Sequence, residues 1–174
     1  TWASSLHEIG ISISHGDFHK HGAYITRCAD MPGFSKTEQE RLSALILGQR
    51  GKLEKLKKFL PDGDFCWVLV FCLRLAALLY RSRDNLVVAP DVRVSLQGGE
   101  YAGRTKASQT ARARGSGDKN GTEGGHGVFS VSFPASWLAA NPLSASALAD
   151  EAAIWQRAGF GWTIKRRSAA RGRT

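Results

Sequence analysis

The run F-C-W-V-L-V-F-C-L-R-L-A-A-L-L-Y, residues Phe65 to Tyr80, decides how this chain folds. It is the longest apolar stretch, yet it falls short of the about 20 residues that a membrane-spanning helix needs, and it carries Arg74 near its middle. We therefore predict a core helix over residues 64–83. A buried arginine needs a partner, because an unpaired charge is costly away from water. We expect either a structural salt bridge to a carboxylate such as Glu8 or Asp30, or a bound anion.

The residues before this run predict further helices. Ser35 followed three places on by Glu38 is a capping box, in which side chains and backbone satisfy each other at a helix start. Apolar residues from Leu42 to Leu53 continue at helical spacing, so this helix is expected to bury one stripe and to expose Gln49. Helical pieces are expected over residues 2–14, 19–26 and 35–53, which together with the core helix make a helical domain over 1–84.

After Asp84 the pattern changes from helical to strand-like. V-R-V-S-L and V-F-S-V-S-F alternate apolar and polar residues, which is the period of a half-buried strand. Strands are expected at 86–89, 92–96, 100–105, 128–133 and 161–165, and helices at 134–140 and 144–158. We predict a small antiparallel sheet with one or two covering helices over 85–174, so the fold class of the chain is α+β. A mixture of Gly, Ser and charged residues predicts a flexible insertion at 106–127, and the chain ends in a basic tail.

Positive charge is concentrated in three places. The formal net charge is +9, and cations dominate residues 50–58, 104–114 and 165–173. Clustered cations attract polyanions because binding releases counterions. The pattern indicates a polyanionic partner, either nucleic acid or a phosphate polymer. A solvated basic surface without a partner is the alternative.

Length and cysteine usage limit the class of protein. The 174 residues are enough for one substantial core or two small ones. The first residues, from Thr1, already have the apolar spacing of a helix, and no capping residue precedes them. We therefore expect the chain to be a piece of a longer protein. The sequence shows no leader peptide. Cys28, Cys66 and Cys72 have no C-x-x-C spacing. We expect reduced, buried thiols and a cytoplasmic protein, with peripheral membrane attachment as an alternative.

Four of the five histidines fall between His7 and His21, which resembles a metal site. Metal-dependent phosphohydrolases of the HD class use a His-Asp pair on one helix and a distant Asp on a later buried helix, roughly L-R-I-A-D. Here the pair is His7-Glu8, and the later helix reads L-R-L-A-A, with Ala77 in place of the aspartate. Alanine cannot coordinate a metal. We therefore expect a degenerate motif that holds no metal ion.

Taken together, several motifs resemble the C-terminal region of the exopolyphosphatase and guanosine pentaphosphate phosphatase (Ppx/GppA) family. The motifs are H-E-I-G-I-S-I-S-H, H-K-H-G-A-Y-I, D-M-P-G-F-S, L-G-Q-R-G-K-L, L-R-L-A and W-L-x-x-x-P-L, and the matches span nearly all of residues 2–164. The stretch at 106–127 departs from the family pattern, which has a short connection there.

The resemblance implies a division of labour. In the family, phosphoanhydride hydrolysis belongs to N-terminal actin-like domains that hold magnesium, and this chain has no glycine-rich phosphate loop of that kind. The resemblance implies that the chain carries a degenerate HD-like helical domain and a small sheet domain, which help to bind polyphosphate and join in homodimer formation. The chain is then expected to have no cofactor of its own, to contact its own N-terminal catalytic domains, and not to be catalytic alone.

Several side chains are candidates for contacting phosphate oxygens. They are Arg50, Lys52, Lys20, His21, His15 and Arg74. Arg50 and Lys52 are the strongest, because they share one basic motif and a guanidinium binds phosphate through two parallel hydrogen bonds. A structural network of hydrogen bonds without a ligand is the alternative for each.

Other functions stay open at this point. A working metal phosphohydrolase is opposed by Ala77, and a basic nucleic-acid-binding protein is the third hypothesis. Trp137, Trp155 and Trp162 would then be stacking platforms, but we expect them in the core. The sequence does not decide between exopolyphosphatase and guanosine pentaphosphate phosphatase, because the discriminating site belongs to the N-terminal domains.

Overall fold

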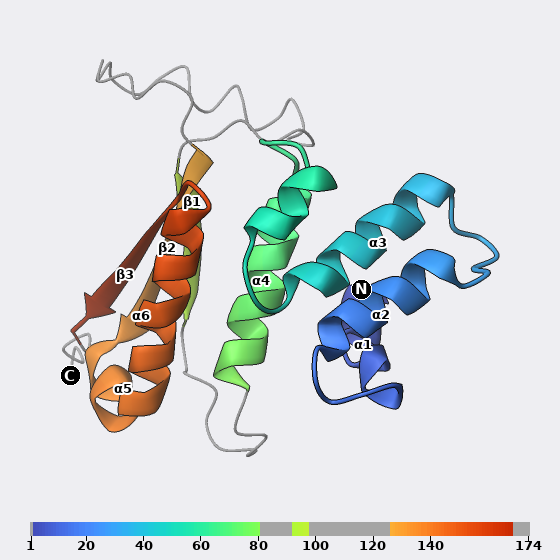
Figure 1. Cartoon of the computed structure of the whole chain (residues 1–174). Helices are drawn as coiled ribbons and strands as arrows, with labels where there is room; N and C mark the ends of the chain where they lie inside the picture. Colours follow the sequence, from blue (N-terminus) through green and yellow to red (C-terminus); the bar gives the residue numbers. More distant parts are fainter. Residues whose placement is uncertain (1, 81–91, 98–125, 169–174) are drawn as a thin grey trace, which may run out of the picture.

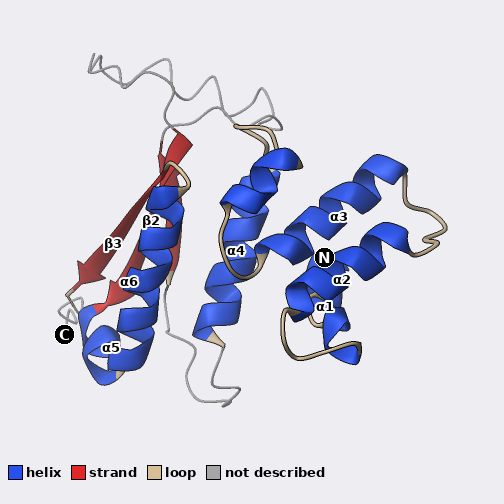
Figure 2. Ribbon diagram, viewed as in Figure 1, coloured by secondary structure: helices blue, strands red, loops and turns tan. Residues whose placement is uncertain are grey.

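The computed structural model describes residues 2–80, 92–97 and 126–168 (Figure 1). Several predicted features lie outside these residues: the strands at 86–89 and 100–105, most of the insertion at 106–127, the cation cluster at 104–114 and the end of the basic tail. Within the described residues, helices occur together with a small sheet (Figure 2). The α+β class is therefore confirmed.

Helical segments make up the chain as far as Tyr80. They are α1 (Trp2–Leu6), the 3₁₀ turn η1 (Ile9–Ser12), α2 (Phe18–Cys28), α3 (Lys36–Gly48), the 3₁₀ turn η2 (Glu54–Lys58) and α4 (Cys66–Leu79). Figure 1 shows α1, α2 and α3 as one group, with α4 between α3 and the sheet. α4 is the predicted core helix, and it buries Trp67, Phe71 and Arg74 among others.

The single helix predicted over 2–14 is wrong, because the helix breaks after Leu6 and continues as η1. η1 places Gly10 directly against α2: a Cβ on Gly10 would lie 1.9 Å from the carbonyl oxygen of Phe18 and 2.4 Å from the nitrogen of Gly22. Only glycine permits two backbones to approach so closely. Because the helix breaks here, the N-terminal segment packs closely against α2 at Gly10.

α3 begins as predicted and ends earlier. Oγ of Ser35 accepts from the backbone of Glu38, and the Glu38 carboxylate accepts from the backbone of Ser35 at 2.8 Å, which completes the capping box. The helix ends at Gly48, and Gln49 is buried, contrary to the outward position predicted. The reason is a tertiary contact that local spacing does not reveal: Nε2 of Gln49 donates to the carbonyl of His7 at 2.5 Å.

The sheet has three described strands in the order β1 (Arg93–Gln97), β2 (His126–Pro134) and β3 (Phe160–Arg167). β1 runs antiparallel to β2, but β3 runs parallel to β2, so the prediction of a wholly antiparallel sheet is wrong. Between β2 and β3 the chain forms α5 (Ala135–Ala140) and α6 (Pro142–Arg157). A helical crossover of this kind returns the chain to the same end of the sheet, which makes the next strand parallel.

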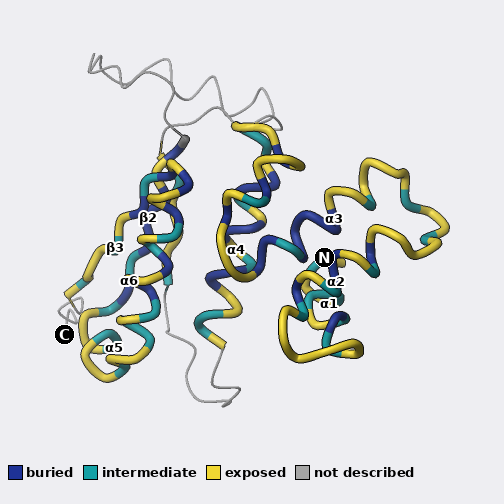
Figure 3. Tube along the Cα trace, viewed as in Figure 1, coloured by how far each residue is buried: buried dark blue, intermediate teal, exposed yellow. Residues whose placement is uncertain are grey.

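One hydrophobic core is shared by the helices and the sheet. Phe71 of α4 stacks on Phe129 of β2, with ring centroids 4.0 Å apart and planes inclined by 9°. Trp67 of α4 packs against Trp155 of α6 and Phe160 of β3. These five side chains are buried, and Figure 3 shows buried residues on both α4 and the sheet with α6. The core therefore crosses the position near residue 85 where a domain boundary was predicted.

The remaining expectations on side chains have mixed outcomes. Trp155 and Trp162 are buried in the core as predicted, and Trp137 is half-buried and stacks on Phe133. All three cysteines are free thiols, but only Cys66 is buried; the predicted burial of the other two is wrong. No helix in the described part of the chain has both the length and the apolar character that crossing a membrane requires.

Candidate functional site

A cleft of about 670 Å³, called the interhelical cleft below, opens between the N-terminal segment, the end of α3, α4 and α6. Its walls mix imidazole, guanidinium and carboxylate groups with apolar side chains. The lining residues are His7, Glu8, Ile11, His15, Phe18, Gln49, Arg50, Gly51, Arg74, Ala77, Leu78, Tyr80, Ala147, Asp150, Glu151 and Ile154. Most of the positions singled out from the sequence therefore lie around one cavity.

The three positions that the sequence suggested as a degenerate HD motif, His7, Glu8 and Ala77, line this cleft. His7 and Glu8 lie between α1 and η1, with Nε2 of His7 3.9 Å from Oε1 of Glu8, and Nδ1 of His7 is 2.8 Å from the carbonyl oxygen of Ser4. Ala77 lies on α4 and presents a methyl group to the same cavity. Within residues 2–80, 92–97 and 126–168, no three histidine, cysteine, aspartate or glutamate side chains are grouped to hold a metal ion.

Arg74 is held in a complete network of protein partners. Its guanidinium binds the Glu151 carboxylate through two hydrogen bonds, that of Nη2 to Oε2 being 2.8 Å long. Nη1 donates to the carbonyls of Gly48 at 2.8 Å and Gly51 at 3.0 Å. Of the two roles considered for this residue, the structure favours the structural ion pair. The predicted partners Glu8 and Asp30 are wrong, because α6 brings Glu151 over α4 from 77 residues away.

Arg50 and His15 are two basic side chains that the cleft presents to solvent. Both side chains belong to exposed residues. The guanidinium carbon of Arg50 lies 5.9 Å from the centroid of the Phe18 ring, which is a cation–π distance. Such a contact orients the side chain without occupying all of its N–H donors. Arg50 is therefore free in geometry to bind an oxyanion in the cleft.

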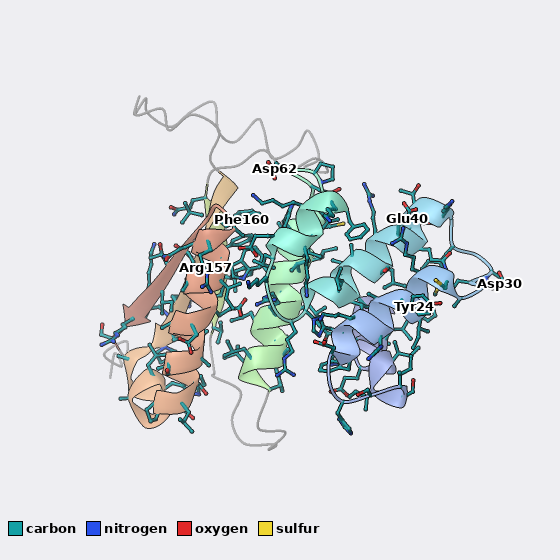
Figure 4. The ribbon with its side chains drawn as sticks, viewed as in Figure 1. Tyr24, Asp30, Glu40, Asp62, Arg157 and Phe160 are labelled. Atoms are coloured by element: carbon teal, nitrogen blue, oxygen red, sulfur yellow. The ribbon has the colours of Figure 1, made fainter. Side chains whose placement is uncertain are left out.

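Three other candidates lie outside the cleft. Lys20 is exposed and pairs with Asp17 at 2.8 Å, and it lines a smaller pocket of about 200 Å³ that also contains Tyr24 and Glu40. Figure 4 labels Tyr24 on α2 and Glu40 on α3. His21 is half-buried and Lys52 is exposed, and neither lines the interhelical cleft. The structure therefore does not bring all the predicted anion contacts together on one surface.

Two further titratable residues, His19 and Lys55, have displaced pKa values. Burial, followed by the charge of Lys55, lowers the pKa of His19 to about 4. Burial, followed by the charges of Arg74 and Lys20, lowers the pKa of Lys55 to about 8. His19 belongs to the histidine-rich stretch that the sequence had already singled out. Lys55 is one of four lysines in a basic run, and nothing in the sequence distinguishes it from its neighbours.

The comparison with known families places the chain in the phosphatase class. Residues 1–152 match the family description "Ppx/GppA phosphatase, domain III". The chain therefore belongs to the Ppx/GppA phosphatase family, and the predicted resemblance to its C-terminal region is confirmed. The match runs from α1 into α6 and so extends across residue 85.

Relatives of the chain carry the name guanosine-5'-triphosphate,3'-diphosphate pyrophosphatase. The protein of Pseudoalteromonas translucida (strain TAC 125) is 28% identical over 166 residues, which cover 94% of this chain and 27% of that protein. The protein of Aliivibrio fischeri (strain ATCC 700601 / ES114) is 29% identical over 165 residues, with the same coverage of 94% and 27%. The Aeromonas hydrophila protein is 39% identical over 87 residues, 48% of this chain and 18% of that protein. The chain thus spans about a quarter of the length of the first two relatives.

Proposed function

We propose that this chain is an accessory region of an exopolyphosphatase, which helps to hold a polyphosphate chain while phosphoanhydride hydrolysis takes place in N-terminal actin-like domains. The observation that carries the proposal is the composition of the interhelical cleft. Arg50 and the imidazoles of His7 and His15 line the cleft, and Ala77 lines it at the position where an HD motif has a metal ligand. The described cleft therefore offers hydrogen-bond donors for phosphate oxygens but lacks one ligand of a catalytic metal site.

The helical part is, in this proposal, a degenerate HD-like domain. A metal phosphohydrolase needs several ligands facing one cavity. His7 and Glu8 face this cleft, but Ala77 supplies no third ligand. Introducing a carboxylate there by Ala77→Asp gives a direct test. If the cleft has the geometry of an HD metal site, the variant should bind Mn²⁺ measurably more tightly than the wild type. The magnesium of the parent enzyme belongs, by the same proposal, to the N-terminal domains.

Polyphosphate binding by the 174-residue chain is the experiment that tests the proposal. Binding to a polyanion is expected to weaken at least tenfold between about 50 mM and about 200 mM salt, because counterions are released. Arg50→Gln should weaken it about tenfold, since a charge-assisted contact is lost. Arg157→Gln is the matched control: Arg157 is exposed at the end of α6 and outside the cleft (Figure 4). No binding at low salt would overturn the proposal, and duplex DNA serves as competitor to test the nucleic-acid alternative.

Homodimer formation is the second half of the proposal, and an apolar groove of about 640 Å³ supports it. An exposed stripe of Leu69, Cys72 and Ala76 of α4 with Phe65 just before it lines the groove, and Trp2 of α1 lines it too. Spacings of four, three and four residues keep a stripe on one face of a helix, which suits pairing with a second copy of the same helix. Sedimentation should show a dimer that Leu69→Glu dissociates. A wild-type monomer at all concentrations would contradict this half.

A second candidate is the equivalent region of a guanosine pentaphosphate phosphatase. The observation that favours it is the name guanosine-5'-triphosphate,3'-diphosphate pyrophosphatase, carried by each of the relatives above. Both substrates present phosphoanhydride oxygens, so only the guanosine distinguishes them. Competition separates the candidates: guanosine pentaphosphate should displace polyphosphate more strongly than tripolyphosphate does if the cleft recognises the nucleoside. Equal displacement would favour the exopolyphosphatase.

A further inference from the structure

A pocket of about 330 Å³, called the α5–α6 pocket below, lies between these two helices and β3. Both helices lie against the sheet (Figure 1). The pocket has an apolar lining except for Arg166 of β3, and the short side chains of Ala135, Ala139, Ala145 and Ala149 leave its space open. Small-molecule sites commonly measure about 300 to 1,000 Å³. The pocket is therefore of adequate size for the apolar body of a small ligand.

α6 separates this pocket from the interhelical cleft. Leu148 and Ala149 of α6 line the pocket, whereas Ala147, Asp150 and Glu151 of the same helix line the cleft. Glu151 is also bound by Arg74 on that side. The pocket and the cleft are therefore distinct cavities, and the carboxylates of α6 line the cleft and not the pocket.

The direction of the Arg166 side chain follows from the register of β3. In the pairing with β2, Ile164 lies opposite Val131 and Arg166 lies opposite Phe133, and both β2 residues are buried in the core. Alternate residues of a strand share one face of the sheet. Arg166 therefore belongs to the face that the helices cover, and Lys165 belongs to the opposite face. Because Arg166 is also exposed, its guanidinium lies where the pocket opens to solvent.

The positive charge of Arg166 has no carboxylate beside it in the pocket lining. The described part of the chain also supplies no hydrogen bond or ion pair for its guanidinium. The three cavities described above differ in this respect, since the interhelical cleft contains Asp150, the smaller pocket between α2 and α3 contains Glu40, and the apolar groove contains Glu38. A carboxylate in the wall of a cavity repels an anion. Of these cavities, the α5–α6 pocket is the one suited to a ligand with an apolar body and a negative end.

We propose that the α5–α6 pocket binds one medium-chain carboxylate, with the acyl chain in the apolar hollow and the carboxylate on the guanidinium of Arg166. A guanidinium binds a carboxylate through two parallel hydrogen bonds. One cation matches one negative charge, which favours a carboxylate over a doubly charged phosphate ester. Each methylene group that the hollow removes from water should improve affinity about fourfold. The site goes beyond the proposed function and does not depend on it.

Calorimetric titration of the 174-residue chain tests the site with three probes. Decanoate has both the chain and the charge, acetate has only the charge, and decanol has only the chain. Decanoate should bind and acetate should show no binding. Decanol should bind about tenfold more weakly than decanoate, because a hydrogen bond between two charged groups is lost. Equal affinity of decanoate and decanol would overturn the role assigned to Arg166.

Two variants separate the charged and the apolar parts of the site. Arg166→Gln should lower decanoate affinity about tenfold and leave decanol affinity unchanged. Lys165→Gln is its matched control, because Lys165 is an exposed cation on the opposite face of the same strand, and it should bind decanoate as the wild type does. Ala149→Phe fills the hollow and should lose both ligands, whereas Ala153→Phe, at an exposed position of α6 outside the pocket, should keep both. Thermal melts of all variants check that each is folded.

Chemical-shift mapping by NMR gives a second readout, which loss of folding would not imitate. In a chain labelled at its alanine methyl groups, decanoate should shift the signals of Ala139, Ala145 and Ala149 and leave that of Ala153 in place. Leu69→Glu tests the apolar groove as the binding place. Loss of decanoate binding in Leu69→Glu, with Ala149→Phe unaffected, would overturn the proposal, and so would absence of decanoate binding by the wild type. Both outcomes leave the polyphosphate proposal to its own titration, because the interhelical cleft takes no part.

Discussion

Arg74 and Lys55 are two cations that contact the same loop, residues 48–51, and they differ in how completely they are paired. Arg74 has a carboxylate bound through two hydrogen bonds and two carbonyls as further acceptors. Nζ of Lys55 donates to one carbonyl, and burial with the charges of Arg74 and Lys20 lowers the pKa of Lys55 to about 8 against the attraction of Asp17. Removing one partner of a buried ion pair is costly, because it leaves an uncompensated charge. A half-buried cation with few partners should contribute much less, and the following predictions test this difference.

The largest effect is expected at the complete pair. Glu151→Gln leaves the Arg74 charge buried and unneutralised, so the free energy of unfolding should fall by about 3 to 5 kcal/mol, measured by urea denaturation. The pair of exposed Arg41 with half-buried Asp64, 3.5 Å apart, is the control, and Arg41→Gln should cost at most about 1 kcal/mol, because the arginine keeps its contact with water. The double variant Arg74→Met with Glu151→Met should recover much of the loss. A similar cost for Glu151→Gln and Arg41→Gln would contradict the structural role.

Acid should destabilise the protein through His19. Its pKa of about 4 in the folded state is below the ordinary 6.5, so the unfolded state binds the proton first. Stability that is fully present above pH 6.5 is therefore lost as the pH falls towards 4, by about 2 to 3 kcal/mol. His19→Gln should remove this loss, whereas His15→Gln, at an exposed position, should keep it. Parallel pH curves for wild type and His19→Gln would show that His19 is not the titrating group.

Two glycines distinguish backbone strain from side-chain crowding. Gly51 and Gly33 both have positive φ, +78° and +90°, so alanine at either position should cost about 1 to 2 kcal/mol of stability. Gly33 has nothing of the described chain within 4 Å of its Cβ position, and a Cβ on Gly51 would lie 3.4 Å from Nζ of Lys55 and 3.7 Å from Nε2 of His19, which are ordinary van der Waals contacts. Gly51→Ala and Gly33→Ala should therefore lose similar amounts of stability in urea denaturation. A much larger loss for Gly51→Ala would show that its surroundings do not accept a side chain.

The smallest effect concerns the stability of Lys55 itself. Its folded pKa of about 8 lies below the ordinary 10.5, so wild-type stability should rise relative to Lys55→Met as the pH increases from 8 to 10.5. The change should be about 1 kcal/mol, because the side chain is only partly removed from water. Thermal melts of both proteins over this range measure it. A difference that stays constant with pH would mean that burial does not suppress the Lys55 charge.

The parts of the fold that depend on local signals could be predicted from the sequence. The core helix around Phe71 follows from an apolar run too short for a membrane, and the start of α3 follows from Ser35 and Glu38. The link between His7-Glu8 and Ala77 was predicted from a family motif, and the structure brings these positions to one cleft. In each case the determining residues are close in sequence or belong to a known pattern.

The parts that depend on distant contacts could not be predicted. The direction of β3 depends on the α5 and α6 crossover, which strand patterns alone do not reveal. The partner of Arg74 is Glu151, 77 residues away, and an arginine in an apolar run does not indicate which of several carboxylates approaches it. Lys55 differs from Lys57 and Lys58 only in facing the interior, which depends on how η2 packs.

The stacking of Phe71 on Phe129 has a consequence for how the molecule folds. Because α4 completes its core only against β2, β3 and α6, neither half has its whole apolar interior until the other is in place. Refolding should therefore follow a single cooperative transition in which helix and sheet signals return together. A polypeptide ending at residue 85 would expose Trp67 and Phe71 to water, and it should aggregate instead of behaving as an independent helical protein.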